Sequence, residues 1–579
     1  MSHSKSPTTA GLFLLFLWSL QGQVNSQVLT ASVPSYAPLS VECPSNQQLL
    51  RLAGSAVGRN QTLSEPETRY RLGRKSVVDP LWREFFTNGP GKNTGYQSSI
   101  LMTQNQQDWP VFAIAHSGGG LRASLYAAGV MQALDPRSTS SPLGGVYPLA
   151  TYVTGLSGGS WAVASVFANN FLPMSEMVSG WQLEKDMVLP GGINPLKNAK
   201  FLDAVHDTAK LKEDVGFNIS LTDHWGRAIG YHFLPGTSSE NFYVNSPTTA
   251  HGAGLLMSSL QSTRGMLDFQ FPIPIIVSDH KPVDESTANP NHVAVSGSTY
   301  VPLSAPVYEY TPFEFGSFDP QLSAFIPSEF LGTSLSSGKP VVPPAVAKAA
   351  KTSTTNLCVR GFDQLSFIMG SSATLFNALN GLPVQYTSVI ETLVKRLSGN
   401  SDRKLTARYP NPFKGVNGPS GFDRSDKDEL AIVDGGENGE NIALNPLLAP
   451  ARQVDVILAS DASADSDSRG INGADWPNGS SMINTFLRVN KILPAGTASF
   501  PQVPLDPKIW EQQGLSSRPA FFGCETTNIS SNTAFPLVIY LPNSPTQSPP
   551  FTNYSTFKLK LISQFSHGVY DTAENIESK

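Results

Sequence analysis

Short apolar runs alternate with stretches of helical apolar spacing through the middle of the chain. Residues 108–170 display this alternation most clearly, in the order strand, glycine-rich turn and helix. Two further strand-like runs span residues 429–433 and 454–459. Strands that alternate with helices are typical of α/β proteins, in which helices cover the faces of a sheet. The pattern therefore predicts an α/β fold.

Elsewhere the pattern is less regular. Residues 27–42 are polar and rich in turn formers, which predicts an N-terminal arm. Residues from about 175 to 345 contain Pro- and Gly-rich stretches and predict a cap-like insertion with some strands. Residues 401–428 are charged and rich in Gly and Pro, which is typical of a surface excursion. No change in composition is sharp enough to separate two domains. The single large domain over residues 43–570 and the tail over 571–579 take their bounds from the family resemblance described below.

The first 26 residues have the pattern of a secretory signal peptide, residues 1–26. Lys5 provides a positive start, and residues 10–20 (AGLFLLFLWSL) form an apolar core that is too short to cross a bilayer. Val24 and Ser26 are small side chains at the positions that precede cleavage before Gln27. A signal anchor is the alternative, and cleavage is the expectation.

Composition excludes one class of function and supports export. The chain of 579 residues carries a net charge of −5, so bulk electrostatics give no reason to expect nucleic-acid binding. Its three cysteines, Cys43, Cys358 and Cys524, are an odd number, which predicts one disulfide in an oxidising compartment and leaves either a free thiol or a cysteine whose partner is absent from this sequence; the pairing stays open. Five sequons are consistent with secretion. Their asparagines, the predicted glycosylation sites, are Asn60, Asn218, Asn478, Asn528 and Asn553.

The first segment that indicates chemistry is a run of three glycines between a predicted strand and a predicted helix, in residues 117–122 (SGGGLR). Glycines at a helix start leave backbone N–H groups open at the positive end of the helix dipole, where they stabilise an anion. In an acyl-transfer enzyme that anion is the tetrahedral oxyanion, and Gly119 and Gly120 are the candidate donors. Arg122 is a cation in the first helical turn, where the dipole disfavours it. It therefore predicts an anionic partner such as a lipid phosphate, with a salt bridge to a protein carboxylate as the alternative.

The second segment is a serine at a sharp turn, in residues 155–159 (GLSGG), again between a predicted strand and a predicted helix. The G-x-S-x-G spacing is typical of a nucleophile elbow, which exposes the serine hydroxyl above the edge of a sheet. We predict that Ser157 is a nucleophile. An ordinary strand-to-helix turn is the alternative.

The third segment places an aspartate at the end of a predicted strand and directly before two glycines. Asp434 follows the apolar residues 430–433. If burial makes its carboxylate more basic, it could take the proton of Ser157. A turn-forming Asp-Gly pair is the alternative interpretation.

A histidine base is the other way to activate a serine, and the residue types leave it open. The chain has nine histidines: His3, His116, His206, His224, His232, His251, His280, His292 and His567. His567 alone follows Asp434, as the order Ser, Asp, His of the α/β-hydrolases requires. His116, before the three glycines, resembles the His-Gly-Gly-Gly oxyanion loop of lipases.

These three segments, in this order, resemble the fungal lysophospholipase/phospholipase B family. That family shares its catalytic domain with the cytosolic phospholipases and, more distantly, with patatin. The matching segments are 117–123 (SGGGLRA), 154–161 (TGLSGGSW) and 433–441 (VDGGENGEN), with further likeness in 311–320 (TPFEFGSFDP), 358–363 (CVRGFD), 454–461 (VDVILASD), 521–524 (FFGC) and 540–543 (YLPN). The resemblance covers about residues 43–570. It implies a three-layer α/β acyl-hydrolase fold of the patatin and cytosolic-phospholipase type.

The resemblance also implies a mechanism and a substrate class. Ser157 would be the nucleophile and Asp434 its base, without histidine; Gly119 and Gly120 would form the oxyanion hole, and Arg122 would meet the lipid phosphate. The enzyme would cleave fatty-acyl esters of lysophospholipids and phospholipids and release fatty acid and a glycerophospho-alcohol. This chemistry implies no cofactor and no metal. The expected partners are lipids at membrane or micelle surfaces, with no nucleic acid and no obligate protein partner.

The C-terminus departs from the family pattern. Family members usually continue further, with additional cysteines and often a hydrophobic anchor signal. Residues 571–579 (DTAENIESK) provide no apolar tail for a lipid anchor. The expectation is secretion to the extracellular space or cell wall, either as a soluble form or as part of a longer chain.

Two other functions remain open from the residues alone. A secreted lipase or carboxylesterase with a Ser-His-Asp triad would use His567. An inactive lipid-binding relative would have no activated serine. The presence of Ser157, Asp434, the glycines and Arg122 together favours the enzyme.

Overall fold

The computed structural model describes most of the chain between residues 35 and 560. The described ranges are 35–45, 48–94, 109–137, 141–246, 249–283, 301–350, 356–374, 384–397, 404–418, 421–465, 476–524, 535–543 and 559–560. The predicted signal peptide and the predicted tail therefore lie outside the described residues.

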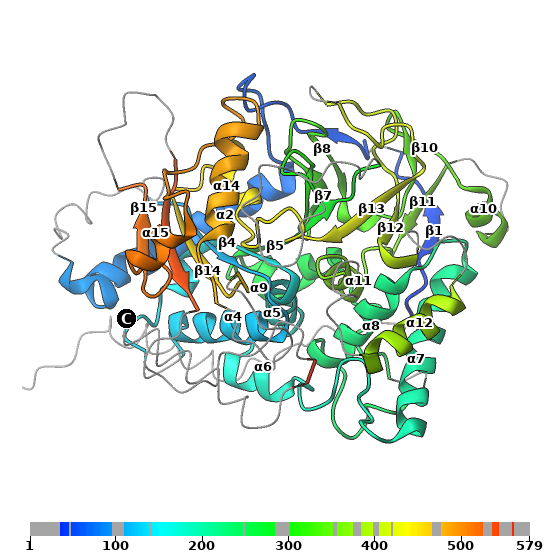
Figure 1. Ribbon diagram of the computed structural model, residues 1–579. Helices are drawn as coiled ribbons and strands as arrows, with labels where there is room; N and C mark the ends of the chain where they lie inside the picture. Colours follow the sequence, from blue (N-terminus) through cyan, green and yellow to red (C-terminus); the bar gives the residue numbers. More distant parts are fainter. Residues whose placement is uncertain are drawn as a thin grey trace, which may run out of the picture.

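A mixed β-sheet runs through the centre of the molecule, with helices on both sides (Figure 1). The strands are β1 Leu39–Glu42, β2 Arg51–Leu52, β3 Phe112–His116, β4 Ala150–Leu156, β5 Ile273–His280, β6 Val307–Tyr310, β7 Glu314–Ser317, β8 Ala324–Pro327, β9 Leu335–Ser336, β10 Lys339–Pro340, β11 Leu357–Arg360, β12 Ala407–Pro410, β13 Glu429–Asp434, β14 Val456–Asp461, β15 Ala520–Phe522 and β16 Leu537–Pro542. The helices are α2 Glu65–Thr87, α4 Gly120–Leu134, α5 Ser157–Ala168, α6 Met174–Gly180, α7 Pro195–Asp214, α8 Leu221–Phe233, α9 Arg264–Leu267, α10 Pro344–Ala350, α11 Leu365–Ser371, α12 Val384–Arg396, α14 Ser480–Leu487 and α15 Pro507–Gln512. The sheet order is β15-β16-β14-β3-β4-β5-β6-β7-β8-β2, and β13 pairs with both β5 and β12.

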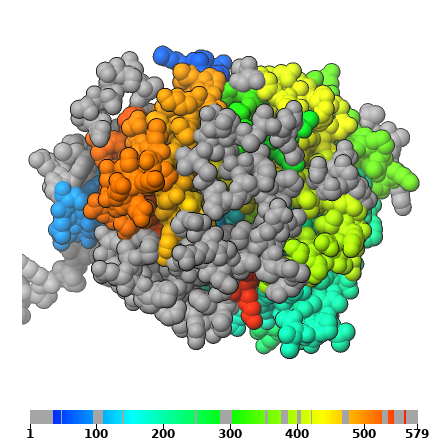
Figure 2. Space-filling model, viewed as in Figure 1, coloured from blue at the N-terminus to red at the C-terminus, as the bar shows by residue number. Residues whose placement is uncertain are grey.

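The parallel half of the sheet follows the predicted alternation of strands and helices. Strands β16, β14, β3, β4 and β5 are parallel neighbours, and α4 connects β3 to β4. Every residue of β3, β4 and β5 is buried, which explains why these strands appear in the sequence as nearly continuous apolar runs. The predicted α/β fold is confirmed. β15, at one edge of the sheet, lies at the left of the molecule, and the helices α7 and α12 lie at the lower right (Figure 1, Figure 2).

Side-chain alternation along β4 directs different helices to its two faces. The Tyr152 hydroxyl donates a 2.8 Å hydrogen bond to Glu67 of α2. Gly155, three residues later, lies on the opposite face, where a Cβ atom would be only 2.9 Å from the backbone of Gly159 in α5. The absence of a side chain at Gly155 therefore lets the start of α5 pack directly on the strand.

The region predicted as a cap-like insertion, about residues 175–345, is only partly separate from the sheet. Its first part forms helices, among them α7 and α8. Its second part supplies β5 to β8, which are integral strands of the main sheet, so the prediction was wrong for them. The reason is pairing with strands that are distant in the sequence: β5 lies between β4 and β6, and an apolar run does not show which strands it will pair with. The predicted surface excursion at 401–428 likewise contains β12, whose Tyr409 is fully buried.

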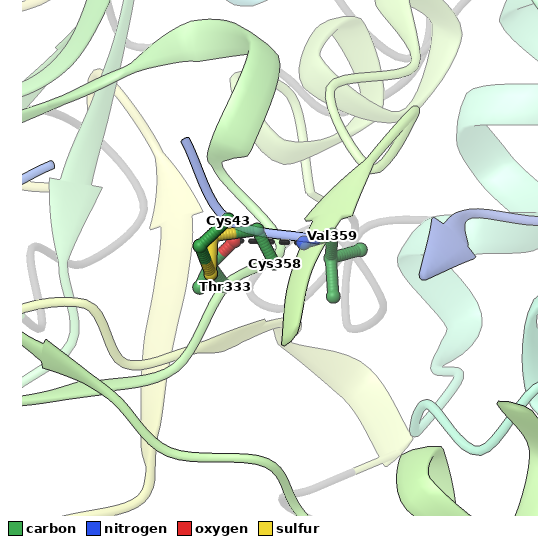
Figure 3. Close-up of a disulfide and its surroundings, with 4 residues drawn as sticks. All are labelled: Cys43, Thr333, Cys358 and Val359. Atoms are coloured by element: carbon green, nitrogen blue, oxygen red, sulfur yellow. Dashed lines mark hydrogen bonds between the residues drawn. A yellow bond between two sulfur atoms is a disulfide. The ribbon is translucent and has the colours of Figure 1, made fainter. Parts of the chain in front are cut away.

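The described part of the predicted N-terminal arm is tied to the fold. β1 pairs antiparallel with β11, and directly after β1 a disulfide joins Cys43 to Cys358 (Figure 3). Beside the disulfide, the Val359 amide donates a 2.9 Å hydrogen bond to the Thr333 hydroxyl (Figure 3). Cys524 is a free, exposed cysteine. The expected single disulfide is the Cys43–Cys358 pair, and Cys524 is the third cysteine that the odd number left over.

Removal of this disulfide is expected to destabilise the protein. The bond closes a loop between residues 315 positions apart, so its loss frees a long segment in the unfolded chain. A Cys43→Ser/Cys358→Ser variant should lose about 2–4 kcal/mol of unfolding free energy, measured by denaturant titration. The control is Cys524→Ser, which should unfold like the wild type. Equal unfolding midpoints for all three proteins would contradict the stabilising role of the bond.

Three of the five predicted glycosylation sites lie in described residues. Asn60 and Asn218 are exposed, and the Asn218 amide donates to Glu429 at 2.6 Å. Asn478 is half-buried, and its amide donates to the Asp465 carbonyl at 3.3 Å. Asn528 and Asn553 lie outside the described residues. Glycosylation remains a prediction for all five.

Within the same described ranges, no helix combines the length and the apolar character that a membrane crossing requires.

Candidate active site

The three segments singled out in the sequence meet at one edge of the sheet. β3 and β4 are parallel neighbours, so the loops that follow them, at Gly118–Gly120 and Ser157, lie side by side. β13 ends at Asp434 opposite Ser278 of β5, which is the next strand beyond β4. The topology thus brings together residues that are far apart in the sequence.

Ser157 has the backbone conformation of a nucleophile elbow. Its φ is 49°, in the left-handed region that residues other than glycine rarely adopt. The Ser157 amide donates to the carbonyl of Ser372 at 2.9 Å and to its hydroxyl at 3.0 Å, at the end of α11. These contacts hold the strained turn at the half-buried Ser157.

Close backbone packing explains the glycine that follows the serine. A Cβ atom on Gly158 would lie 2.0 Å from the Gly120 carbonyl oxygen. Any side chain at position 158 would therefore push the elbow away from the glycine loop. The glycines of the 155–159 motif serve the contact between the two loops as well as the turn.

Asp434 is in direct contact with the serine. The Ser157 Oγ donates a 2.9 Å hydrogen bond to Asp434 Oδ2, and the Gly436 amide donates to Oδ1 at 2.9 Å. Burial raises the pKa of Asp434 to about 7, against the opposing effects of these two hydrogen bonds. The carboxylate is therefore a much stronger base than a solvent-exposed aspartate.

The glycine loop presents two open amides beside Ser157. The Gly118 amide donates to the Asn441 carbonyl at 2.9 Å, and so is engaged. For the amides of Gly119 and Gly120, no acceptor lies within hydrogen-bonding distance in the described part of the chain. Gly119 has a φ of 135°, which only glycine adopts readily, and it turns the loop into the start of α4. The loop has the composition and position of an anion-binding site.

Arg122 lies beside this loop but faces protein groups. It is 2% exposed, and its Nη2 donates to the Ala462 carbonyl at 2.8 Å. Burial raises the pKa of Asp465 to about 8, and the Arg122 charge opposes that rise; it also opposes the burial-driven rise in the pKa of Asp461. Arg122 thus interacts electrostatically with these two buried carboxyl groups, and the salt bridge that sequence reasoning gave as the alternative stays a prediction. A role at a lipid phosphate stays a prediction.

Asn441 is a site residue that sequence reasoning missed. It ends the loop that begins at Asp434, and its side-chain amide donates to the Gly118 carbonyl at 3.3 Å and to Ser463 at 2.8 Å. The backbone carbonyl of Asn441 also accepts a hydrogen bond from the Gly118 amide. Through these bonds Asn441 holds the loop that follows Asp434 against the glycine loop. The signal was present in the sequence, as polar residues directly after the Asp-Gly-Gly motif, but nothing local indicated their partner.

Replacement of Asn441 by alanine is expected to slow catalysis without weakening substrate binding. The glycine loop would lose its side-chain support, and small misplacements in an active site cost up to about 100-fold in rate. We expect kcat to fall about 10- to 100-fold with KM nearly unchanged in steady-state ester hydrolysis. Asn169→Ala, at the end of α5, is the matched control and should retain wild-type kcat. A rise in KM at constant kcat would contradict the positioning role.

The histidines within the described ranges do not contact the pair. His116 is fully buried on β3, its ring nitrogens have no hydrogen-bond partner among the described residues, and burial lowers its pKa to about 3. His280 bonds to Tyr308 and Asp423 at 3.0 and 2.7 Å. No described histidine donates to or accepts from Ser157 or Asp434. His567, the candidate of the triad alternative, lies outside the described residues.

Comparison with known proteins gives a consistent result. Residues 112–576 match the family described as the lysophospholipase catalytic domain. Lysophospholipase 3 of Aspergillus fumigatus is 36% identical over 90% of this chain and 78% of its own length. Probable lysophospholipase 3 of Schizosaccharomyces pombe is 34% identical over 94% and 76%, and lysophospholipase 3 of Saccharomyces cerevisiae is 32% identical over 96% and 76%.

Solved structures support the fold. Human GIVD cytosolic phospholipase A2 superposes with a TM-score of 0.60 at 15% identity, over 94% of this chain and 68% of that one. The same human protein in complex with methyl γ-linolenyl fluorophosphonate gives a TM-score of 0.56. The expected fold of the patatin and cytosolic-phospholipase type is confirmed.

Proposed function

The chain belongs to the lysophospholipase family of hydrolases, and on this basis we propose that it hydrolyses fatty-acyl esters of lysophospholipids and phospholipids through an acyl-enzyme on Ser157, with Asp434 as the base. The observation that carries the proposal is the 2.9 Å hydrogen bond from the Ser157 hydroxyl to Asp434. It is supported by the raised pKa of Asp434 and by the two open amides of the glycine loop.

Acylation begins when the Ser157 Oγ attacks the ester carbonyl carbon. The hydroxyl proton passes to Asp434 Oδ2, and the carbonyl oxygen becomes an oxyanion that the amides of Gly119 and Gly120 stabilise. Collapse of this intermediate breaks the ester bond. The leaving glycerol oxygen takes the proton from Asp434, and the fatty-acyl group remains on Ser157.

Deacylation repeats these steps with water. Asp434 accepts a proton from the water, whose oxygen attacks the acyl carbonyl in the same oxyanion site. When the second intermediate collapses, the Ser157 oxygen recovers its proton from Asp434 and the fatty acid leaves. The products of a lysophospholipid are one fatty acid and one glycerophospho-alcohol.

Arg122 is the proposed partner of the substrate phosphate. Its Nη2 lies 3.1 Å from the position that a Cβ on Gly119 would occupy, so the charge borders the oxyanion loop. To contact a phosphate, the guanidinium would have to give up its hydrogen bond to the Ala462 carbonyl.

Secretion is proposed as well. The signal-like segment at residues 1–26, the exposed sequons at Asn60 and Asn218 and the Cys43–Cys358 disulfide support an oxidising, extracellular destination.

The proposed activity is tested with purified protein and lysophosphatidylcholine. Free fatty acid and glycerophosphocholine should appear in equal amounts, and the Ser157→Ala protein should release neither. Absence of fatty acid in the wild-type reaction would favour the lipid-binding alternative and overturn the proposal.

The pH dependence of the reaction follows from the pKa of Asp434, which burial raises to about 7. Only the ionised carboxylate accepts the serine proton. With zwitterionic lysophosphatidylcholine, kcat/KM should therefore increase about tenfold per pH unit below pH 7 and level off above it. A flat profile across the acidic side of that pKa would contradict Asp434 as the base.

A further inference from the structure

Two large apolar side chains at the start of α7 are exposed to solvent. Ile193 is 104% exposed and Leu196 is 80% exposed, which makes them the two most exposed large apolar residues among those described. Lys197 of α7 lies over the ring of Tyr243 at 5.4 Å, so the segment around Tyr243 packs beside the start of α7. Exposed apolar side chains that cluster mark a site of interaction more often than isolated ones do.

The segment that carries them, residues 191–197, is called the α7 tip. Local hydrogen bonds fix its shape: Asn198 accepts from the Gly191 amide at 2.7 Å and donates to the Gly192 carbonyl at 2.9 Å. Asn194 caps the helix by accepting from the Lys197 amide at 3.1 Å. The backbone of the tip is therefore held by defined hydrogen bonds, and the exposure of Ile193 and Leu196 follows from its conformation.

Two lysines follow the apolar side chains along α7. Lys197 and Lys200 are exposed, and the first turn of α7 contains no acidic residue, although the helix dipole would favour one there. Asp203, one turn further along, is paired with Arg396 at 3.1 Å. Apolar side chains flanked by lysines have the composition of a surface that binds at an anionic lipid interface.

We propose that the α7 tip docks on anionic phospholipid surfaces, with Ile193 and Leu196 inserted among the acyl chains and Lys197 and Lys200 against the phosphates. This inference rests on the proposed function, since it supplies the lipid surface from which the active site draws its substrate. α7 forms part of the outer margin of the molecule, away from β15 (Figure 1, Figure 2). It packs on α8, and α8 packs on α11, which leads to the Ser372 contact of Ser157.

The test compares binding of the full chain to vesicles by sedimentation. Ile193→Asp and Leu196→Asp should each lower the partition coefficient on phosphatidylcholine/phosphatidylglycerol vesicles by about tenfold or more, because each removes one aliphatic side chain that would insert into the bilayer. Val57→Asp and Leu505→Asp replace exposed aliphatic residues elsewhere, 55% and 46% exposed, and should bind like the wild type. Lys197→Gln/Lys200→Gln should lose the preference for anionic over pure phosphatidylcholine vesicles.

Activity separates docking from catalysis. On a short-chain lysophospholipid below its critical micelle concentration, the tip variants should retain wild-type rates, whereas their rates on vesicles should fall with binding. Wild-type vesicle binding by Ile193→Asp and Leu196→Asp would overturn the inference. So would a wild-type dimer that these variants dissociate without any change in vesicle binding, since the tip would then join two copies of the chain. Failure of the proposed function would give a different result: the wild-type protein would bind vesicles through the tip but would hydrolyse no lysophospholipid.

Discussion

Ser157→Ala is expected to lower kcat for lysophospholipid hydrolysis by about 10⁴- to 10⁶-fold, since no other described group occupies the place of the attacking oxygen. The Ser157 Oγ is the donor in the 2.9 Å bond to Asp434, and alanine removes both the nucleophile and that bond. The backbone contacts to Ser372 do not involve the Ser157 side chain, so the elbow should remain folded. Fatty-acid release under saturating substrate measures the loss.

The matched control for this change is Ser179→Ala. Ser179 is an exposed serine at the end of α6 whose hydroxyl donates to the nearby Glu176 carbonyl. Its replacement should leave kcat at the wild-type value. Residual activity of Ser157→Ala within about tenfold of wild type would assign the nucleophile to another residue.

Asp434→Asn is expected to lower kcat by about 10³-fold or more, because an amide of the same shape has no basicity toward the serine proton. The asparagine side chain can still accept a hydrogen bond from Ser157 Oγ, so substrate binding and KM should change little. Asp428→Asn is the matched control: Asp428 is an exposed carboxylate near the start of β13, paired with Lys414. His567→Ala is the second control. It should be near wild type if Asp434 acts alone, and inactive if a triad operates.

The same substitution should stabilise the protein at alkaline pH. The folded-state pKa of Asp434, about 7, lies above its ordinary value of 3.8. The stabilising contribution of the neutral carboxyl is complete below about pH 4 and is lost as the pH rises through 7. An asparagine side chain is neutral at every pH, so the melting temperature of Asp434→Asn should exceed that of the wild type at about pH 8, and the difference should shrink toward about pH 4. A lower melting temperature on the alkaline side would mean that the loss of activity comes from damage to the fold.

Local sequence patterns were sufficient to predict those parts of the site that depend on residues close together in the sequence. The strand, glycine loop and helix around Gly119, the elbow at Ser157 and the strand that ends at Asp434 all correspond to observed elements. The spacing of apolar residues and the positions of glycines over a short stretch of chain predict each of these elements. The hydrogen bond between Ser157 and Asp434 joins residues 277 positions apart, so the residue pattern offered the pair as one possibility and the family resemblance selected it.

The parts that sequence analysis missed depend on distant partners. Strands β5 to β8 were assigned to an insertion because their pairing with β4 and with each other has no local signal. Asn441 acquires its role from Gly118, which lies 323 residues earlier. For Arg122 the dipole argument predicted an anionic partner. The Arg122 charge opposes the burial-driven rise in the pKa of Asp461 and Asp465, and its contact with a lipid phosphate remains a proposal.

The most direct test of the central claim is the rate at which a fluorophosphonate labels Ser157, measured by mass spectrometry of the modified peptide. Such a compound reacts with an activated serine and leaves ordinary serines unmodified. The account predicts a single adduct on Ser157 that forms at a rate rising up to about pH 7, as Asp434 ionises, and that is at least about 10³-fold slower in Asp434→Asn. Labelling of Ser157 in Asp434→Asn at the wild-type rate would contradict it.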